Sequence, residues 1–98
     1  MSIRRDDLSF DWDDHNIRHL ARHGISPTEV EQVFRNDPMI EHYDVVDGED
    51  RWTAIGAPLS LKILVLVFTV RDSRIRAVTG WEADKRMKKY YFANRGGG

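Results

Sequence analysis

The stretch LKILVLVFTV at residues 61–70 is an apolar run that only Lys62 interrupts. The run is too short to span a bilayer, and its Val, Ile, Phe and Thr residues favour a strand over a helix. A nearly unbroken apolar strand must be covered on both faces. The run therefore predicts a central strand with neighbours along its edges and helices on at least one face of the sheet.

Shorter apolar segments on both sides of this run predict its partner strands. Residues 39–46 and 51–57 flank an acidic turn at 47–50, and residues 75–79 follow the central strand after a short polar turn. Four consecutive strands with short connections predict an antiparallel meander. Residues 8–12 alternate apolar and polar side chains, which predicts one more short strand at an edge of the sheet.

Three further segments carry helix signals. Residues 14–23 have apolar side chains at helical spacing after an Asp that can cap them, and they end before a glycine. A second helix begins at Ser26, because Pro27 suits the first helical position and Glu29 completes a capping box. A basic third helix covers residues 83–93. The predicted fold class is α+β: a small, mostly antiparallel sheet of about five strands with two N-terminal helices and one C-terminal helix.

The length and composition of the chain indicate how many domains it has and where in the cell it acts. With 98 residues the chain has the length of one domain, which we place at residues 1–95, followed by a flexible tail at 96–98. The chain has no cysteine, as is typical of proteins in a reducing cytoplasm. It also lacks an apolar segment that could serve as a secretion signal or cross a membrane. We therefore expect a soluble, cytoplasmic protein.

Charge is divided unevenly along the chain, although the formal net charge is only −1. Residues 26–50 contain eight acids against Arg35 alone, a net of −7. Residues 71–98 contain eight bases against three acids, a net of +5. This asymmetry predicts one face that binds polyanions and another that repels them or binds a basic partner. Two solvated faces are the alternative.

The first helix carries three histidines at successive intervals of four residues: His15, His19 and His23. This spacing places the three imidazoles on one stripe of the helix, with Arg22 nearby. Histidine suits proton transfer near neutral pH, so His19 and His23 are candidate catalytic residues. No H-E-x-x-H motif or cysteine supports a metal site, and we predict none. The alternative is that these residues are surface positions, with His23 favoured by the helix dipole.

Two arginines lie within predicted strands, Arg51 and Arg76. Strand alternation places Arg76 on the less buried face, opposite Ile75, Ala77 and Thr79. Phosphate recognition favours arginine because its planar guanidinium donates two parallel hydrogen bonds. The two residues are therefore candidates for binding a phosphoryl group, and solvated strand arginines are the alternative.

Basic and aromatic residues are interleaved at the start of the last helix. Lys85 and Arg86 lie close in sequence to Trp81 and Tyr90. Aromatic rings stack on unpaired bases, and cations bind the phosphate backbone. The segment is thus a candidate surface for single-stranded RNA, with a solvated basic helix as the alternative.

A series of short motifs runs along nearly the whole chain: Phe10-x-Trp12-Asp13, Arg22-His23-Gly24-Ile25, Glu29-Val30, Val33-Phe34, Asp37-Pro38, Arg51, Ile55-Gly56, residues 65–69 and Arg74-Ile75-Arg76. In their order and spacing these motifs resemble the BrnT family of ribonuclease toxins. The resemblance implies a RelE-like α+β fold and metal-independent RNA cleavage that inhibits translation without a cofactor. It also implies neutralisation by a DNA-binding antitoxin encoded beside the toxin, through which the toxin could form a homo-oligomer.

The resemblance suggests a division of roles among the candidate residues. In an endoribonuclease of this kind the 2′-hydroxyl attacks the adjacent phosphate, and His19 or His23 would transfer a proton. Arg51 and Arg76, with Lys85 or Arg86, would stabilise charge on the phosphoryl oxygens. The residues expected to bind RNA are Arg22, Trp81, Lys85, Arg86 and Tyr90.

Two alternatives stay open. Members of the family usually carry an Arg after the last strand and a Glu in the last helix, where this sequence has Trp81 and Met87. A catalytically degenerate member that only binds an antitoxin or nucleic acid is therefore the second hypothesis. The third is a helix-turn-helix around Gly24, which ranks last because phosphate would repel Glu29 and Glu31 of the second helix.

Overall fold

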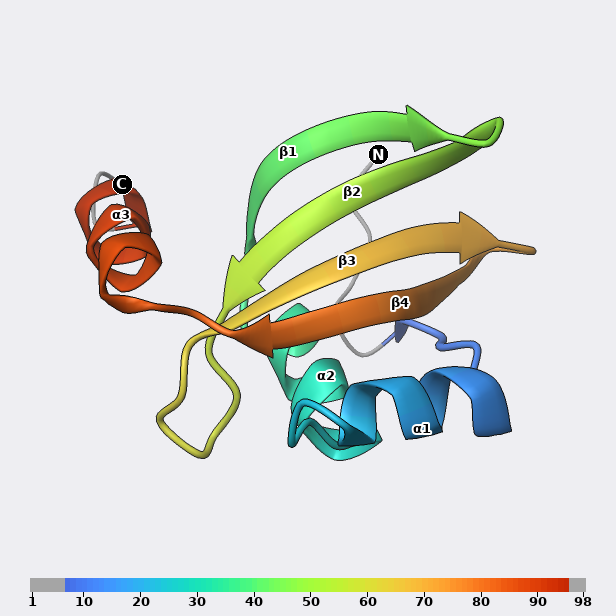
Figure 1. The fold of residues 1–98 in the computed structure, drawn as a ribbon, viewed down its shortest axis with the longest axis horizontal. Coiled ribbons are helices and arrows are strands. Elements are labelled where there is room, and N and C mark those ends of the chain that lie inside the picture. The colour runs from blue at the N-terminus through green and yellow to red at the C-terminus, as the bar shows by residue number, and fades with distance from the viewer. Residues whose placement is uncertain (1–6, 96–98) are drawn as a thin grey trace.

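The computed structural model describes residues 7–95, and its elements follow the predicted order. Residues 1–6 and the predicted tail at 96–98 lie outside the described residues. The α+β class is confirmed, and none of the described helices is long and apolar enough to cross a membrane. The elements in chain order (Figure 1) are α1 (Asp14–Ala21), α2 (Pro27–Arg35), β1 (Met39–Val46), β2 (Glu49–Gly56), β3 (Leu64–Arg71), β4 (Arg74–Glu82) and α3 (Lys85–Arg95).

The sheet within residues 7–95 has four strands in the order β1-β2-β3-β4, all antiparallel. This confirms the predicted meander and places β3 inside the sheet. The fifth strand expected at residues 8–12 was wrong: only Phe10 bridges to Ile75 of β4, in parallel, with two backbone hydrogen bonds of 2.8 Å around it. The pairing ends there because Asp13 caps α1 and redirects the chain.

Both N-terminal helices begin with capping boxes. The Ser26 hydroxyl accepts the Glu29 backbone N–H at 3.2 Å, and the Glu29 carboxylate accepts the Ser26 backbone N–H at 3.1 Å, as predicted. In α1 the cap is Asp13, and the reciprocal partner is Asn16. The helix ends at Ala21, before the predicted end at residue 23, and a glycine with a φ of 73° then turns the chain.

The central strand β3 separates two hydrophobic clusters, as its apolar sequence predicts. Leu64, Leu66 and Phe68 pack with residues of α1 and α2 on one face, which we call the α2 face. Val65 lies on the opposite face and packs with Tyr91 of α3, and we call this face the α3 face. In Figure 1, α1 and α2 lie together below the sheet, whereas α3 stands apart at the left end. Among residues 7–95, no helix covers most of the α3 face.

A β-bulge in β4 changes which of its residues share a face. The register between β3 and β4 shifts between Val67 and Phe68, which leaves Val78 as an extra residue. Simple alternation along β4 therefore fails. Thr79 and Arg76 pair with Val67 and Thr69 of β3, so both of them lie on the α3 face. Arg76 is only 8 % exposed. Arg76 lies opposite Ile75 and Ala77, as predicted, whereas the bulge moves Thr79 to the same face as Arg76. Two carboxylates, not solvent, cover the Arg76 guanidinium.

Candidate functional site

The histidine stripe predicted from the sequence lies on α1 and the turn after it. Of its members, His19 reaches the sheet: its Nε2 shares a hydrogen bond of 3.0 Å with Thr79 Oγ1 on β4. Its other ring nitrogen, Nδ1, has no hydrogen-bond partner among residues 7–95. The His23 ring centroid lies 6.0 Å from that of His19. The structure thus holds the His19 ring by one nitrogen and leaves the other without a hydrogen bond to any described residue.

Two buried residues explain why α1 presents His19 to β4. Leu20 is fully buried in the cluster on the α2 face. Asn16, 1 % exposed, donates through Nδ2 to the backbone carbonyls of Ala77 at 3.2 Å and Asp11 at 2.9 Å. These contacts bind α1 along the outer edge of β4. His19 then lies beside the sheet, where its side chain meets that of the edge strand.

An open pocket of about 370 Å³ lies along α1. Its lining residues are Asp14, His15, Arg18, His19 and Arg22. Arg22 was among the predicted RNA-binding residues, whereas Arg18 was missed. The available signal was its spacing of four from Arg22, which places both guanidinium groups beside the histidine stripe. Two arginines against one aspartate make this pocket suitable for an anion.

Arg51 and Arg76, the two strand arginines, lie in one row across the α3 face. Thr69 of β3 pairs with Arg76, and continuing the β2–β3 register one residue past Trp52 places Arg51 on the other side of Thr69. Neighbouring strands are about 4.8 Å apart, so the two arginines are separated by about 10 Å at their Cα atoms. The structure therefore brings these two predicted residues together on one face.

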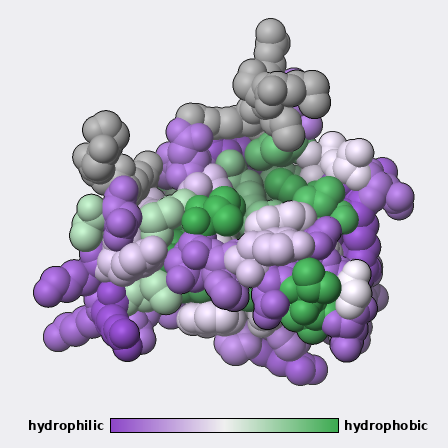
Figure 2. Space-filling view, turned by 90° about the horizontal axis from the view of Figure 1, so that it is seen from above, coloured by the Kyte–Doolittle hydropathy of each residue, from purple (hydrophilic) through white to green (hydrophobic). Residues whose placement is uncertain are grey.

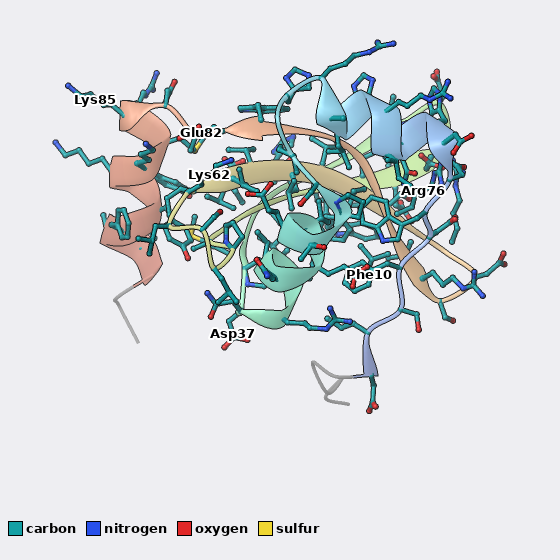
Figure 3. All side chains as sticks on the ribbon, turned by 90° about the horizontal axis from the view of Figure 1, so that it is seen from below. Phe10, Asp37, Lys62, Arg76, Glu82 and Lys85 are labelled. Carbon is teal, nitrogen blue, oxygen red and sulfur yellow. The ribbon has the colours of Figure 1, made fainter. Side chains whose placement is uncertain are left out.

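The guanidinium of Arg76 is already paired with carboxylates. Its Nη2 lies 3.0 Å from Asp13 Oδ2, and its Nη1 lies 3.5 Å from Asp11 Oδ1. The hydrogen bond from the backbone N–H of Asn16 lowers the pKa of Asp13, and the charge of Arg76 lowers it further. In Figure 3, Arg76 lies near the start of α1. Its charge therefore ties the segment before α1 to β4 and is only partly available to a ligand.

Arg51 is likewise paired, through a carboxylate that sequence reasoning missed. Glu49 accepts a hydrogen bond from Arg51 Nε at 3.1 Å and one from Arg71 Nη2 at 2.8 Å. The hydrogen bond from Arg71 is the main reason that the pKa of Glu49 is lowered, and the same bond raises the pKa of Arg71. A phosphate that bound these arginines would have to compete with Glu49.

Trp81 lies on β4 between Thr79, which bonds to His19, and the start of α3. It pairs with Val65, while Thr79 pairs with Val67, so both β4 side chains lie on the same face. The Trp81 side chain is 42 % exposed. Its ring is therefore accessible for stacking at a position adjacent to the residue that holds His19.

The basic residues of α3 lie away from the rest of the predicted site. In Figure 3, Lys85 and Arg76 are at opposite ends of the molecule. Arg86 and Tyr90 line a separate open pocket with Glu41 of β1. The structure thus groups His19, Arg22, His23 and Trp81 around the α1–β4 contact but does not bring the α3 residues to them.

The chemistry of the α1–β4 contact follows from its side chains. Imidazoles transfer protons near neutral pH, and guanidinium groups bind phosphate oxygens through paired N–H donors. Among residues 7–95, no group of three His, Asp or Glu side chains is placed to hold a metal ion. The arrangement therefore suits acid–base chemistry on a phosphate-containing ligand.

A protein-family model described as "Ribonuclease toxin, BrnT, of type II toxin-antitoxin system" matches residues 12–86. The matched region contains the α1–β4 contact, the arginine row and the first residues of α3. Tyr90 lies beyond it. No curated protein matches this chain.

Proposed function

Because the chain belongs to the BrnT family of ribonuclease toxins of type II toxin–antitoxin systems, we propose that it is a metal-independent endoribonuclease that acts in the cytoplasm and inhibits translation. The observation that carries the proposed site is the hydrogen bond between His19 and Thr79. It fixes a proton-transfer group beside a pocket lined by Arg18 and Arg22. This combination supplies the acid–base and charge functions that phosphodiester cleavage requires.

The proposed reaction uses the RNA's own 2′-hydroxyl as nucleophile. His19 Nδ1 accepts the 2′-hydroxyl proton, the 2′-oxygen bonds to the adjacent phosphorus, and the bond from phosphorus to the 5′-oxygen breaks. The leaving 5′-oxygen takes a proton from His23, which gives a 2′,3′-cyclic phosphate and a 5′-hydroxyl. The two ring centroids are 6.0 Å apart, which is close enough for both imidazoles to reach the same phosphodiester. Each positioned proton-transfer group contributes a factor of about 10² to 10⁴ in rate.

We assign the stabilisation of charge on the phosphoryl oxygens to the arginines that no described carboxylate holds. Arg18 and Arg22 line the pocket and form no ion pair with a described residue, so we assign them the direct contacts. Arg51 and Arg76 belong to the same surface but are held by carboxylates. We propose that these two arginines shape the α3 face and attract RNA at longer range.

The RNA strand is proposed to continue past Trp81 towards α3, where Lys85, Arg86 and Tyr90 would contact it. A Lys85→Ala and Arg86→Ala double variant should then bind RNA more weakly and with a smaller salt dependence, because each phosphate contact releases counterions. Filter binding at two salt concentrations measures both quantities. If affinity and salt slope stay unchanged, the RNA path ends before α3.

Cleavage of a labelled single-stranded RNA in the presence of a chelator tests the active site. His19→Ala should reduce the rate by about 100-fold or more, since it removes a proton-transfer group. Thr79→Val should keep the shape of β4 while releasing the His19 ring, lower the rate by about tenfold and change the pH profile of cleavage. Undiminished cleavage by His19→Ala would remove this residue from the mechanism.

Matched arginine variants separate the pocket from general surface charge. Arg22→Ala should lower cleavage by about tenfold or more, because it removes a charge-assisted contact to phosphate. Arg35→Ala removes an arginine of the neighbouring helix that pairs with Glu31 at 3.0 Å, outside the pocket, and should leave the rate unchanged. Equal losses in the two variants would indicate long-range attraction instead of a built site.

The second candidate function is a non-catalytic member that binds its antitoxin or nucleic acid. The observation that favours it is the pairing of Arg51 and Arg76 with carboxylates. Expression of the chain in cells with and without its antitoxin distinguishes the two. Growth arrest that the antitoxin relieves supports the ribonuclease, whereas normal growth at good expression supports the binding module.

The family implies an antitoxin as partner. We propose that this antitoxin binds DNA and that its own oligomerisation brings two or more toxin chains together. Light scattering of the purified complex measures the stoichiometry. A one-to-one complex at all concentrations would contradict the proposed assembly.

A further inference from the structure

The outer edge of β1 is an open strand edge. β1 pairs with β2 along one side, and no other strand among residues 7–95 pairs with it. The backbone N–H of Val45 donates to Asp44 Oδ1 at 2.8 Å, which shows that this group points away from the β1–β2 ladder. A row of outward backbone groups is a template on which another extended chain can pair.

The side chains of β1 on the α2 face are apolar and exposed. Ile40, Tyr43 and Val45 are 52 %, 51 % and 53 % exposed, and their register partners on β2 place all three on this face. Figure 2, which views the molecule from the β1 side, shows apolar surface bordered by hydrophilic surface. A strand added beside β1 would cover part of this apolar surface with its own alternate side chains.

Charge around the same edge selects the kind of chain that can pair there. Glu41, Asp44, Asp47 and Asp50 lie on or next to β1, and none of them forms an ion pair with a described cation. Nucleic acid would be repelled by these carboxylates, and so would the β1 edge of a second copy of this chain. An extended peptide with basic side chains would be attracted.

We propose that β1 binds an extended segment of the antitoxin as a fifth strand of the sheet, with apolar side chains on the α2 face and basic side chains near Asp44 and Asp47. The inference rests on the proposed function only in requiring an antitoxin, which family membership supplies. It does not require RNA cleavage. On binding, a backbone carbonyl of the segment replaces the Asp44 carboxylate at the Val45 N–H and frees Asp44 to pair with a cation.

The sharpest test removes the outward N–H without touching the β1–β2 ladder. Val45→Pro lacks this donor, and proline is tolerated where the N–H faces away from the sheet. Val45→Ala keeps the donor and is the matched control. The affinity of the cognate antitoxin for the full chain, measured by calorimetry, should fall by about tenfold or more in the proline variant relative to the alanine variant, because a carbonyl of the partner is left unpaired.

A second pair of variants tests the charge argument without changing the backbone. Asp47 and Asp72 both occupy hairpin turns with positive φ, 52° and 51°, which asparagine also tolerates. An Asp44→Asn and Asp47→Asn double variant should bind the antitoxin several-fold more weakly at low salt, with a reduced salt dependence, on the order of the effect expected for rim charges. Asp72→Asn, in the β3–β4 turn, should leave the affinity unchanged.

Failure of this inference is distinguishable from failure of the proposed function. RNA cleavage by Val45→Pro in the absence of antitoxin should equal that of the original chain, since Val45 lies outside the α1–β4 site. Equal antitoxin affinity of the proline and alanine variants, or binding of a second toxin copy at this edge, would overturn the inference whatever the cleavage result. If the original chain does not cleave RNA but the proline variant still binds the antitoxin more weakly than the alanine variant, only the proposed ribonuclease activity is overturned.

Discussion

The two edges of the sheet, β4 and β1, have opposite surroundings. Along β4, the segment before α1 and α1 itself cover the strand, with Asn16 bonded to its backbone and Arg76 paired with Asp11 and Asp13. Along β1, no described strand pairs with the outer edge, and the neighbouring carboxylates have no described cation as partner. At the covered edge the chain's own helix forms a cationic pocket, whereas the open edge has outward backbone groups on which another chain can pair.

The largest effect on stability is expected when the contacts that hold α1 against the β4 edge are removed. Asn16→Ala removes two hydrogen bonds to backbone carbonyls and one member of the α1 capping box, all at a residue 1 % exposed. The free energy of unfolding should fall by about 3 kcal/mol, because buried carbonyls lose their donors. Urea denaturation measures the loss. The neighbouring exposed variant His15→Ala should change stability by less than about 0.5 kcal/mol.

Removal of the buried guanidinium on the same edge should have the next largest effect. Arg76→Ala leaves Asp11 and Asp13 without their cation, and we expect a loss of about 2 kcal/mol in unfolding free energy, less than for a fully buried pair because both carboxylates reach solvent. Arg74→Ala, on the same strand and exposed, is the control. Thermal melts that do not distinguish the two variants would show that Arg76 does not hold the segment before α1 to β4.

A substitution remote from both edges of the sheet should lower stability by less and leave the functions assigned to the two edges unchanged. Ser26→Ala removes the hydroxyl that caps α2 while leaving the helix's apolar side intact. The expected loss is about 1 kcal/mol in unfolding free energy. Cleavage and antitoxin affinity of the folded variant should stay unchanged, because α2 contributes to neither edge. An unaltered thermal melt would contradict the assigned role of the cap.

The smallest expected effect is on stability at low pH, through the carboxylate of Glu49 that pairs with Arg51 and Arg71. The pKa of Glu49 is lowered from 4.5, chiefly by the hydrogen bond from Arg71. A lowered pKa means that Glu49 stabilises the fold above its unfolded pKa and that this contribution is lost as the pH falls through the folded pKa. As the pH falls from about 5 to about 3, the unfolding free energy of Glu49→Gln should therefore decrease less than that of the original chain. The difference between the two decreases should be roughly 0.5 kcal/mol after solvent screening. Glu41→Gln, without an ion pair to a described residue, should follow the original chain in urea titrations.

Local patterns were sufficient for much of the fold. The capping box of Ser26 and Glu29 involves neighbours three residues apart, and the apolar run that became β3 is continuous in sequence, so both could be predicted. Helical spacing also predicted that the candidate histidines lie along one stripe with Arg22 nearby, and His19 and His23 do lie close together. The expected fifth strand failed because a capping interaction at Asp13 redirected a segment whose alternation is typical of a strand.

The sequence by itself therefore determined the order of the helices and the four meander strands, the starts of the two N-terminal helices, the burial of β3 on both faces and the uneven charge. Only the tertiary structure decided which candidate residues meet. The contact between His19 and Thr79 joins residues far apart along the chain, and the bulge at Val78 decided which β4 side chains share a face. Alternation placed Arg76 opposite Ile75 and Ala77, but its burial depends on carboxylates of a segment that alternation cannot place. Spacing rules describe neighbours within one element, whereas such contacts depend on how separate elements pack against each other.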